Sequence, residues 1–284
     1  MRASLERQKP DTVKKIIIFI LCCTSFSLLH AQQGVEVGGW LGASHYFGDL
    51  NTSFYLGRPG LAGGVLARYN FNNRVSLKLG MSYANVSAYD SDSDNSFEQA
   101  RNLSFRSAVW GADLQLEFNF LPYTHGSKDE FYTPYIFGGF SVVNFNPQAE
   151  IDDQWFDLRD FGTEGQFRGE EYYSITGGFD MGFGFKFDLS YEWSINVFIM
   201  ARHLFTDYLD DVSTEYPDMD DLESLRGERA VRLSDRSGEL GTLEVPLGQT
   251  NRQRGNSSTN DTYATLGVGL IYYFGDLRCP KYTR

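Results

Sequence analysis

The sequence predicts an all-β protein: an eight-stranded antiparallel up-and-down transmembrane β-barrel with short periplasmic turns and long extracellular loops. Three observations lead to this prediction. Eight segments alternate large apolar residues with small or polar ones, a period of two that is typical of strands. The connections between them are alternately short and long, as in bacterial outer-membrane barrels. Aromatic residues also gather at the strand ends beside the short connections, as at a membrane interface.

The length allows one large all-β domain or two small ones, and the composition excludes some partners. The 284 residues include 23 Phe, 17 Tyr and 29 Gly, and the formal net charge is −12. Nucleic-acid binding needs clustered Lys and Arg to neutralise phosphates, so an acidic chain argues against it. The sequence contains no cofactor-binding motif, and we expect no cofactor.

The N-terminus has the pattern of a secretory signal peptide, expected at 1–31. Lys14 and Lys15 precede an apolar run at 16–29, and Ala31 offers a small residue for cleavage. The run is short for a membrane-spanning helix. Export from the cytoplasm follows from this interpretation.

The remaining chain divides into a barrel at 32–275, with a long extracellular loop at 207–261, and a periplasmic tail at 276–284. Once the signal peptide is removed, Cys279 in the tail is the one cysteine left, so no intramolecular disulfide can form. Cys279 is therefore either a spectator thiol or a link to another chain.

The first four strands have clear alternation. They are expected at 35–46, 61–71, 75–83 and 107–121. On one face they carry Val35, Val37, Leu41 and Ala43; Leu61, Val65, Ala67, Tyr69 and Phe71; Val75, Leu77, Leu79, Met81 and Tyr83; and Trp110, Ala112, Leu114, Leu116, Phe118 and Phe120. The other face holds mostly small and polar residues, which is the pattern of a barrel with a polar lumen.

The fifth strand, at 132–145, is the least regular, because both faces of its centre are apolar or small. The sixth and seventh form a hairpin at 173–203, with a turn at 189–191. We expect Phe187 opposite Trp193 and Met181 opposite Ile199, which makes Asp180 a diagonal neighbour of Arg202. The eighth strand, at 262–275, again alternates.

A soluble eight-stranded barrel with an apolar cavity has the same period of two, so the polar face must decide between the two. A solvent-exposed face would be rich in Lys and Glu. Here the polar face is mostly Gly, Ser, Thr and Asn with isolated charges of both signs, which suits a narrow lumen. Aromatic residues at the short turns also favour the membrane barrel, because they match an interfacial belt. They are Tyr69 and Phe71, Phe120 and Tyr123, Phe187 and Trp193, and Tyr272 and Phe274.

The charges on the polar face predict a lumen network. Its members, beside Glu36, are Arg68, Lys78, Asp113, Glu117, Asp180, Lys186 and Arg202. Eight strands leave a bore that side chains can fill. The network is either a structural plug of ion pairs or the lining of a conduit for small solutes.

Two other patterns are weak candidates for chemistry. Asp90, Asp92 and Asp94 resemble the start of a calcium loop, but Asn95 and Arg101 stand where glycine and a bidentate glutamate are required. The acidic stretch 207–223 is either a weak divalent-cation site or, as we rather expect, a solvated and partly disordered segment, and 227–260 has a flexible composition.

Catalysis is not expected, because the chain lacks the usual catalytic motifs. Ser44 and His45 are adjacent and point to opposite faces of a strand, so they cannot pair. His203 falls on the apolar face, and His125 falls in a periplasmic turn. We therefore expect that the protein is not an enzyme.

Several segments resemble a family of Bacteroidota outer-membrane β-barrels, the PorG-like family. They are VEVGGWLGASHYFGDLN at 35–51, RYNFN at 68–72, RNLSFRS at 101–107, LEFNFLPY at 116–123, YTPYIF at 132–137 and the ending YYFG at 272–275. The resemblance implies a non-enzymatic component of the type IX protein secretion system, which supports gliding motility in some species. It also implies an anchoring role: such barrels attach a periplasmic ring, built from the lipoprotein PorK and from PorN, to the outer membrane.

Partner contacts are then expected on the periplasmic side. The expected contact residues are Asn72, Asn73, Arg74, Tyr123, Ser190, Tyr191 and Cys279. The alternative is an OmpA- or OmpX-like surface barrel whose external loops act in adhesion or envelope maintenance.

Overall fold

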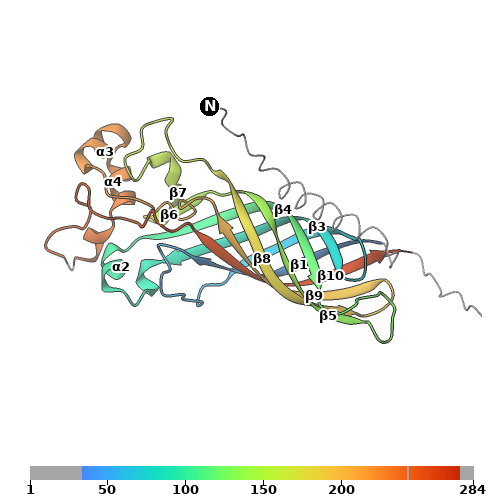
Figure 1. The fold of residues 1–284 in the computed structure, drawn as a ribbon. Coiled ribbons are helices and arrows are strands. Elements are labelled where there is room, and N and C mark those ends of the chain that lie inside the picture. Colours follow the sequence, from blue (N-terminus) through green and yellow to red (C-terminus); the bar gives the residue numbers. More distant parts are fainter. Residues whose placement is uncertain (1–33, 242, 276–284) are drawn as a thin grey trace, which may run out of the picture.

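The protein is a closed eight-stranded antiparallel barrel (Figure 1). The computed structural model describes residues 34–241 and 243–275. The barrel strands are β1 (Gly34–Phe47), β2 (Gly60–Asn70), β3 (Val75–Tyr89), β4 (Ser104–Asn119), β5 (Tyr132–Asn144), β8 (Ile175–Asp188), β9 (Trp193–Leu204) and β10 (Thr262–Phe274). β1 pairs with both β2 and β10, and β3 pairs with β4, so the eight barrel strands form a closed ring. This confirms the predicted fold class.

The connections divide the barrel into two unlike ends. The links 71–74, 120–131 and 189–192 lie at one end, and the longer links 48–59, 90–103, 145–174 and 205–261 lie at the other. In outer-membrane barrels the short turns face the periplasm and the long loops face outward. We therefore call these the periplasmic and external ends.

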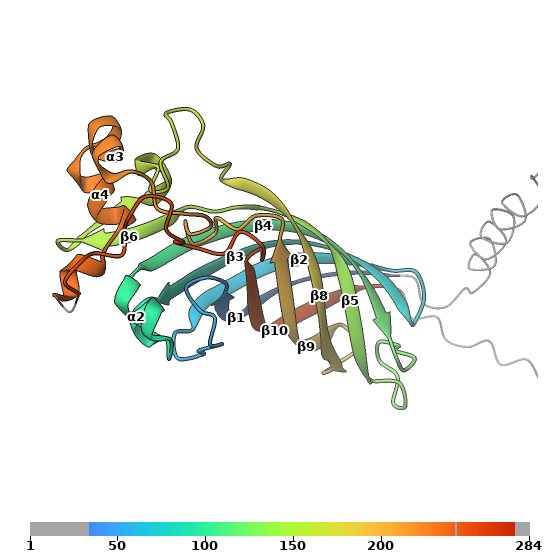
Figure 2. The same ribbon diagram turned by 60° about the vertical axis from the view of Figure 1, so that its left-hand side comes forward.

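The long loops fold into a cap over the external end (Figures 1 and 2). It contains η2 (Asp90–Asp92), α2 (Ser96–Arg101), the hairpin β6 (Pro147–Ile151) and β7 (Gln154–Asp157), η3 (Leu158–Phe161), α3 (Met219–Arg226), α4 (Glu228–Ser234) and η4 (Ser237–Leu240). The expectation of a solvated segment at 207–223 was wrong, because Asp207, Asp210 and Asp211 are buried. The stretch 227–260 is also folded into the cap, where Leu233 and Arg254 are buried. None of the helices within 34–241 and 243–275 is long and apolar enough to cross a membrane.

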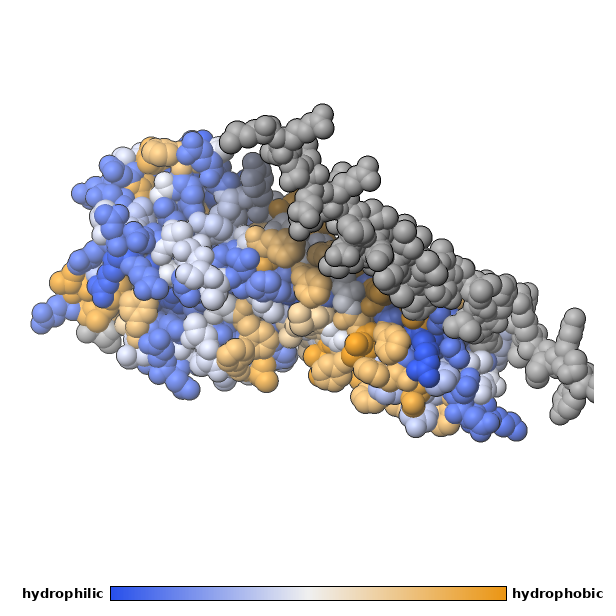
Figure 3. All heavy atoms as spheres, viewed as in Figure 1, coloured by the Kyte–Doolittle hydropathy of each residue, from blue (hydrophilic) through white to orange (hydrophobic). Residues whose placement is uncertain are grey.

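The outer wall of the barrel is apolar. Large side chains such as Leu41, Met81 and Phe140 expose 71%, 65% and 66% of their surface there. Figure 3 shows apolar residues over the barrel and polar residues over both ends. Exposed apolar surface on this scale marks contact with a nonpolar phase, because soluble monomers rarely expose large apolar patches. A closed barrel with this exterior and a charged interior spans a lipid bilayer.

Strand β5 shows why its sequence pattern was unclear. Its inward residues Tyr135 and Phe137 are aromatic and buried. They lie opposite Gly184 and Gly182 of β8. A Cβ on Gly182 would lie 2.3 Å from the Phe137 ring, so glycine is required for that ring to fit in the lumen.

The register expected for the 173–203 hairpin was wrong by two residues. Phe187 faces Ile195 and Met181 faces Ala201, so Asp180 lies directly opposite Arg202. The turn is longer than expected, at 189–192, and closes when the N–H groups of Leu189 and Ser190 donate to the Trp193 carbonyl. A shift of two residues keeps every side chain on its face, so the period of two could not detect it.

Candidate functional site

The periplasmic half of the lumen holds a four-residue ion network. Arg68 of β2 pairs with Glu36 of β1, and its Nε lies 2.8 Å from Glu117 Oε2 of β4. Lys186 of β8 donates to the same Glu117 oxygen over 2.6 Å. Each of these side chains is nearly fully buried. The network therefore ties four strands together across the bore.

The external half of the lumen is organised around Arg202 of β9. Its Nε and Nη2 donate to the two carboxylate oxygens of Asp180 over 2.7 and 2.9 Å, a bidentate pair. Nη2 also donates to Asp113 over 3.2 Å, and Nη1 donates to the hydroxyl of Tyr263 over 2.8 Å. Gln115 and Ser141 also donate to Asp180, over 2.8 and 2.9 Å.

Lys78 lies between these two clusters, with its Nζ 5.1 Å from the centre of the Phe137 ring and 5.8 Å from that of Phe198. Such cation–π contacts partly replace lost hydration. The structure thus places every residue expected in the lumen network inside the barrel and buries it. Apart from Lys78, these charges are paired at short distance, as the structural plug of ion pairs requires.

The periplasmic mouth is closed by His125, from the link 120–131. Its Nε2 lies 3.2 Å from Glu36, its Nδ1 lies 2.9 Å from Asp188, and its ring stacks on Tyr273 with centroids 4.2 Å apart. Burial lowers the pKa of His125, but its hydrogen bonds to Asp188 and Glu36 outweigh burial, so the pKa is raised above 6.5. Because Glu36 also holds Arg68, this link is fixed to the lumen network.

The residues expected to contact periplasmic partners separate into two groups. Asn72 and Tyr123 are buried: the Asn72 side chain accepts the Arg74 and Val75 N–H groups, and the Tyr123 hydroxyl donates to Asp188. Tyr123 therefore does not belong to the outer aromatic belt as expected. Its ring packs inward because this link folds over the barrel mouth.

The other residues of that set lie nearer the surface. Arg74 and Ser190 are exposed, while Asn73 and Tyr191 are partly exposed. Asn73 accepts the N–H of Tyr123, and the Tyr191 hydroxyl donates to the Gly275 carbonyl over 2.6 Å. Cys279 lies outside the described residues. The exposed Lys128 and Asp129, from the expected contact stretch 122–133, also belong to this surface.

Two carboxyl groups share one hydroxyl where the cap meets the barrel. The Tyr46 hydroxyl lies 2.5 Å from Asp210 and 2.6 Å from Asp261. A neutral tyrosine donates one proton, so one of these carboxyl groups must itself be protonated and donate. Burial and neighbouring carboxylates raise the pKa of Asp210 well above 3.8, and burial raises that of Asp261 to about 7.

Two arginines hold the cap loops together. Arg101 of α2 donates to both oxygens of Asp90, and also to the carbonyls of Arg254 over 2.6 Å and Asp49 over 2.8 Å. Arg254 in turn pairs with Glu164 over 3.0 Å. These contacts join four loops that are distant in sequence, and they explain why the acidic cap is compact.

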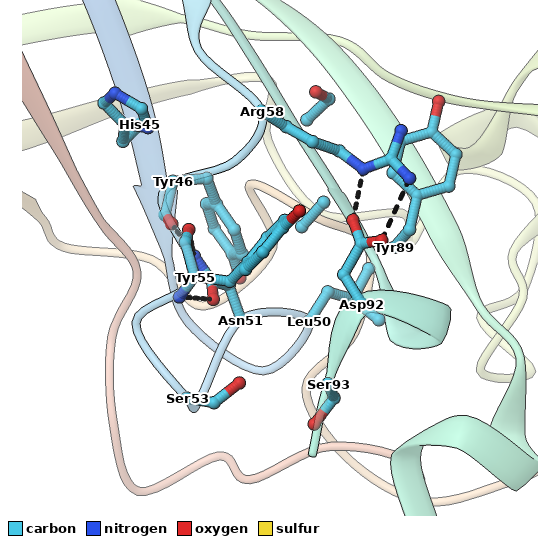
Figure 4. Close-up of a pocket in the computed structure, with 12 residues that line it drawn as sticks. His45, Tyr46, Leu50, Asn51, Ser53, Tyr55, Arg58, Tyr89, Asp92 and Ser93 are labelled. Carbon is cyan, nitrogen blue, oxygen red and sulfur yellow. Dashed lines mark hydrogen bonds and ion pairs between the residues drawn. The ribbon is translucent and has the colours of Figure 1, made fainter. Parts of the chain in front are cut away.

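The calcium hypothesis fails on the same contacts. Asp90 is buried against Arg101, and Asp92 pairs with Arg58, whose guanidinium also lies over the Tyr89 ring (Figure 4). Asp94 is exposed and apart from them. The pocket in Figure 4 has a volume of about 10 Å³, enough for one water molecule. In the described ranges no three His, Cys, Asp or Glu side chains are arranged to hold a metal ion.

The histidines form no catalytic arrangement with serine in the described part of the chain. His45 and His203 lie on the outward face. Ser44 faces inward and donates to the Asn85 carbonyl over 2.6 Å. His203 Nδ1 lies 2.9 Å from Thr262 Oγ1 at the surface.

A closed eight-stranded barrel with an apolar exterior, a lumen filled by ion pairs and a folded external cap is an outer-membrane β-barrel protein. Its location is the outer membrane, because the bilayer is the phase that its outer wall requires. Residues 14–230 match the family described as "Domain of unknown function (DUF6089)", and the chain belongs to that family. No curated protein sequence matches the chain.

Several solved outer-membrane proteins are similar to this chain. The N-terminal β-barrel domain of Pseudomonas aeruginosa OprF is 11% identical, with 86% of this chain and 100% of that chain covered and a TM-score of 0.38. Ail of Yersinia pestis is 9% identical, covering 87% and 100% with a TM-score of 0.40. OprG of Pseudomonas aeruginosa is 12% identical, covering 87% and 97% with a TM-score of 0.39.

Proposed function

We propose that this barrel is an accessory component of the type IX protein secretion system, which anchors the periplasmic ring of PorK and PorN to the outer membrane. The sequence resemblance to PorG-like barrels suggests the system. The observation that carries the anchoring role is the fixed periplasmic link 120–131. His125 holds this link between Glu36 and Asp188, so its exposed residues form a preorganised surface. A rigid surface loses little conformational entropy on binding, which favours a structural attachment.

The proposed contact surface consists of exposed residues at three periplasmic turns. They are Arg74, Lys128, Asp129, Leu189, Ser190 and Glu192. Asn72 and Tyr123 support this surface from below, and Cys279 in the tail would add to it.

The test is co-purification of PorK and PorN with a tagged barrel after mild crosslinking. The double variant Arg74→Glu/Lys128→Glu reverses both charges on the proposed surface and should reduce recovery of the ring proteins at least tenfold. The matched control is Arg168→Glu, an exposed cap residue at the opposite end, which should recover wild-type amounts. Failure of both ring proteins to purify with the wild-type barrel would overturn the proposal.

A surface role in adhesion or envelope maintenance is the second candidate, and the folded cap favours it. Arg101 and Arg254 hold this cap in one conformation, so it presents a fixed surface to the outside. The two candidates differ in the function that loss of the cap should affect. Replacing the cap residues 216–250 by a short linker should leave secretion intact if the barrel is an anchor, and should remove the surface function if it is not.

A further inference from the structure

Part of the membrane-facing wall is hollowed. A groove of about 560 Å³ crosses the outer face of β2, β3, β4 and β5. Its floor is formed at Gly63 and Ala112, where large side chains are absent. Tyr83 and Trp110 form its external border, with ring centroids 4.8 Å apart. This volume is in the range of ligand pockets, and the lining is apolar.

The depth of the groove assigns it to the outer leaflet. Gly63 lies close to the external end of β2, which begins at Gly60, and Trp110 is the last large apolar residue facing outward on β4 before Ala108 and Arg106. Lipid-modified periplasmic proteins place their acyl chains in the inner leaflet, at the other end of the barrel. The groove is therefore in contact with the lipids of the external leaflet.

A cation stands above the groove on the same face of β4. Arg106 is four residues beyond Trp110, or about 13 Å along the strand and about 10 Å along the membrane normal at a tilt of about 40°. Its guanidinium stacks on Trp155 at 3.4 Å and donates to Gln148 over 3.2 Å. Within the described ranges no carboxylate forms an ion pair with it. It is a preorganised and unneutralised cation at headgroup level.

We propose that this wall is a binding site for a phosphorylated glycolipid of the outer leaflet. One acyl chain lies in the groove over Gly63 and Ala112, and a headgroup phosphate is bound by Arg106. The groove is continuous with the wall that already contacts lipid, so the acyl chain enters from the bilayer without crossing a polar surface. Arginine provides the planar donor geometry that phosphate favours.

The site can be tested by native mass spectrometry of the folded barrel in detergent, titrated with bis-phosphorylated lipid A. The wild-type protein should retain one lipid molecule. Ala112→Phe fills the groove and should weaken retention at least tenfold. The matched control is Ala264→Phe, the same substitution on the outer face near the external end of β10, which should retain lipid as the wild type does. Heat-modifiable migration shows that each variant is folded.

Two further arms identify the headgroup and the lipid class. Arg106→Gln should bind lipid A no more tightly than the same glycolipid without its phosphates. Binding of the acyl chain in the groove should be unchanged in this variant. Equal retention by Ala112→Phe and Ala264→Phe would overturn the site, since the lipid would then be a nonspecific annulus. Retention of phosphatidylglycerol as strong as that of lipid A would overturn the assignment to a glycolipid.

Discussion

The shared proton at Tyr46 makes the stability of the cap depend on pH. The hydroxyl of Tyr46 touches Asp210 and Asp261, and the pair must hold an extra proton for both contacts to be hydrogen bonds. Raising the pH removes that proton and leaves two carboxylates facing one hydroxyl. Asp49 adds negative charge from a neighbouring loop, and burial together with Asp261 and Asp49 raises the pKa of Asp207 to about 8. The arginines of the cap stay charged throughout.

The sign and the magnitude follow from proton linkage. The pKa of Asp261 is raised from 3.8 to about 7 in the folded cap, so the folded state binds more protons than the opened state between these values. The free energy of opening therefore falls as the pH rises through this window. Each extra bound proton contributes about 1.4 kcal/mol per pH unit. From about pH 5 to about pH 7, one proton corresponds to about 3 kcal/mol, or roughly a hundredfold in the opening equilibrium.

Hydrogen–deuterium exchange of peptides from 205–261 measures this opening directly, once rates are corrected for base-catalysed intrinsic exchange. Protection of these peptides should fall at least tenfold between the two pH values, while peptides of β8 and β9 keep their protection. Asp210→Asn supplies a permanent donor in place of the shared proton and should reduce the pH dependence, leaving the part that comes from Asp207. Equal protection at both pH values, or an Asp210→Asn variant as pH-sensitive as the wild type, would refute the shared-proton reasoning.

Three further predictions concern the barrel itself. Arg202→Met leaves the buried Asp180 and Asp113 without their ion-pair partner and should lower the free energy of unfolding by about 3–5 kcal/mol in urea titrations. The double variant Arg202→Met/Asp180→Asn should recover part of that loss. Because the pKa of His125 is raised in the folded state, protonated His125 stabilises the periplasmic link fully below about pH 6.5, and this stabilisation is lost as the pH rises through the folded pKa. Hydrogen–deuterium exchange of 120–131 should therefore increase with pH beyond the intrinsic rate. His125→Gln should not show this increase. Unheated protein should migrate differently from heated protein in detergent gels, and a chain that stays soluble without detergent would contradict the membrane assignment.

The sequence predicted those features of the fold that depend only on the alternation of apolar and polar residues along a strand. Alternation identified the eight strands and separated the lumen residues from the lipid-facing ones, because a barrel requires that separation along every strand. It could not give the hairpin register, since Asp180 keeps its face whether it lies diagonal or opposite to Arg202.

The two ends of the barrel were much less predictable. Arg101 and Arg254 are 153 positions apart and meet because four loops pack together, which no local pattern records. The composition suggested a solvated acidic segment. Asp210 and Asp261 can nevertheless be buried in the cap, because their raised pKa values let the pair hold a proton and so reduce its negative charge. Likewise, nothing near His125 in the sequence indicated that Glu36 and Asp188 would hold it.

The ion network in the periplasmic half of the lumen also constrains how the barrel assembles. Glu36 and Arg68 come from the first two strands, Glu117 from the middle of the chain and Lys186 from its second half, while closure waits for β10 to pair with β1. An incompletely inserted barrel would present unmatched charges and open strand edges to lipid. We therefore expect insertion to be all-or-none. Pairing of β10 with β1 would be the step that completes it.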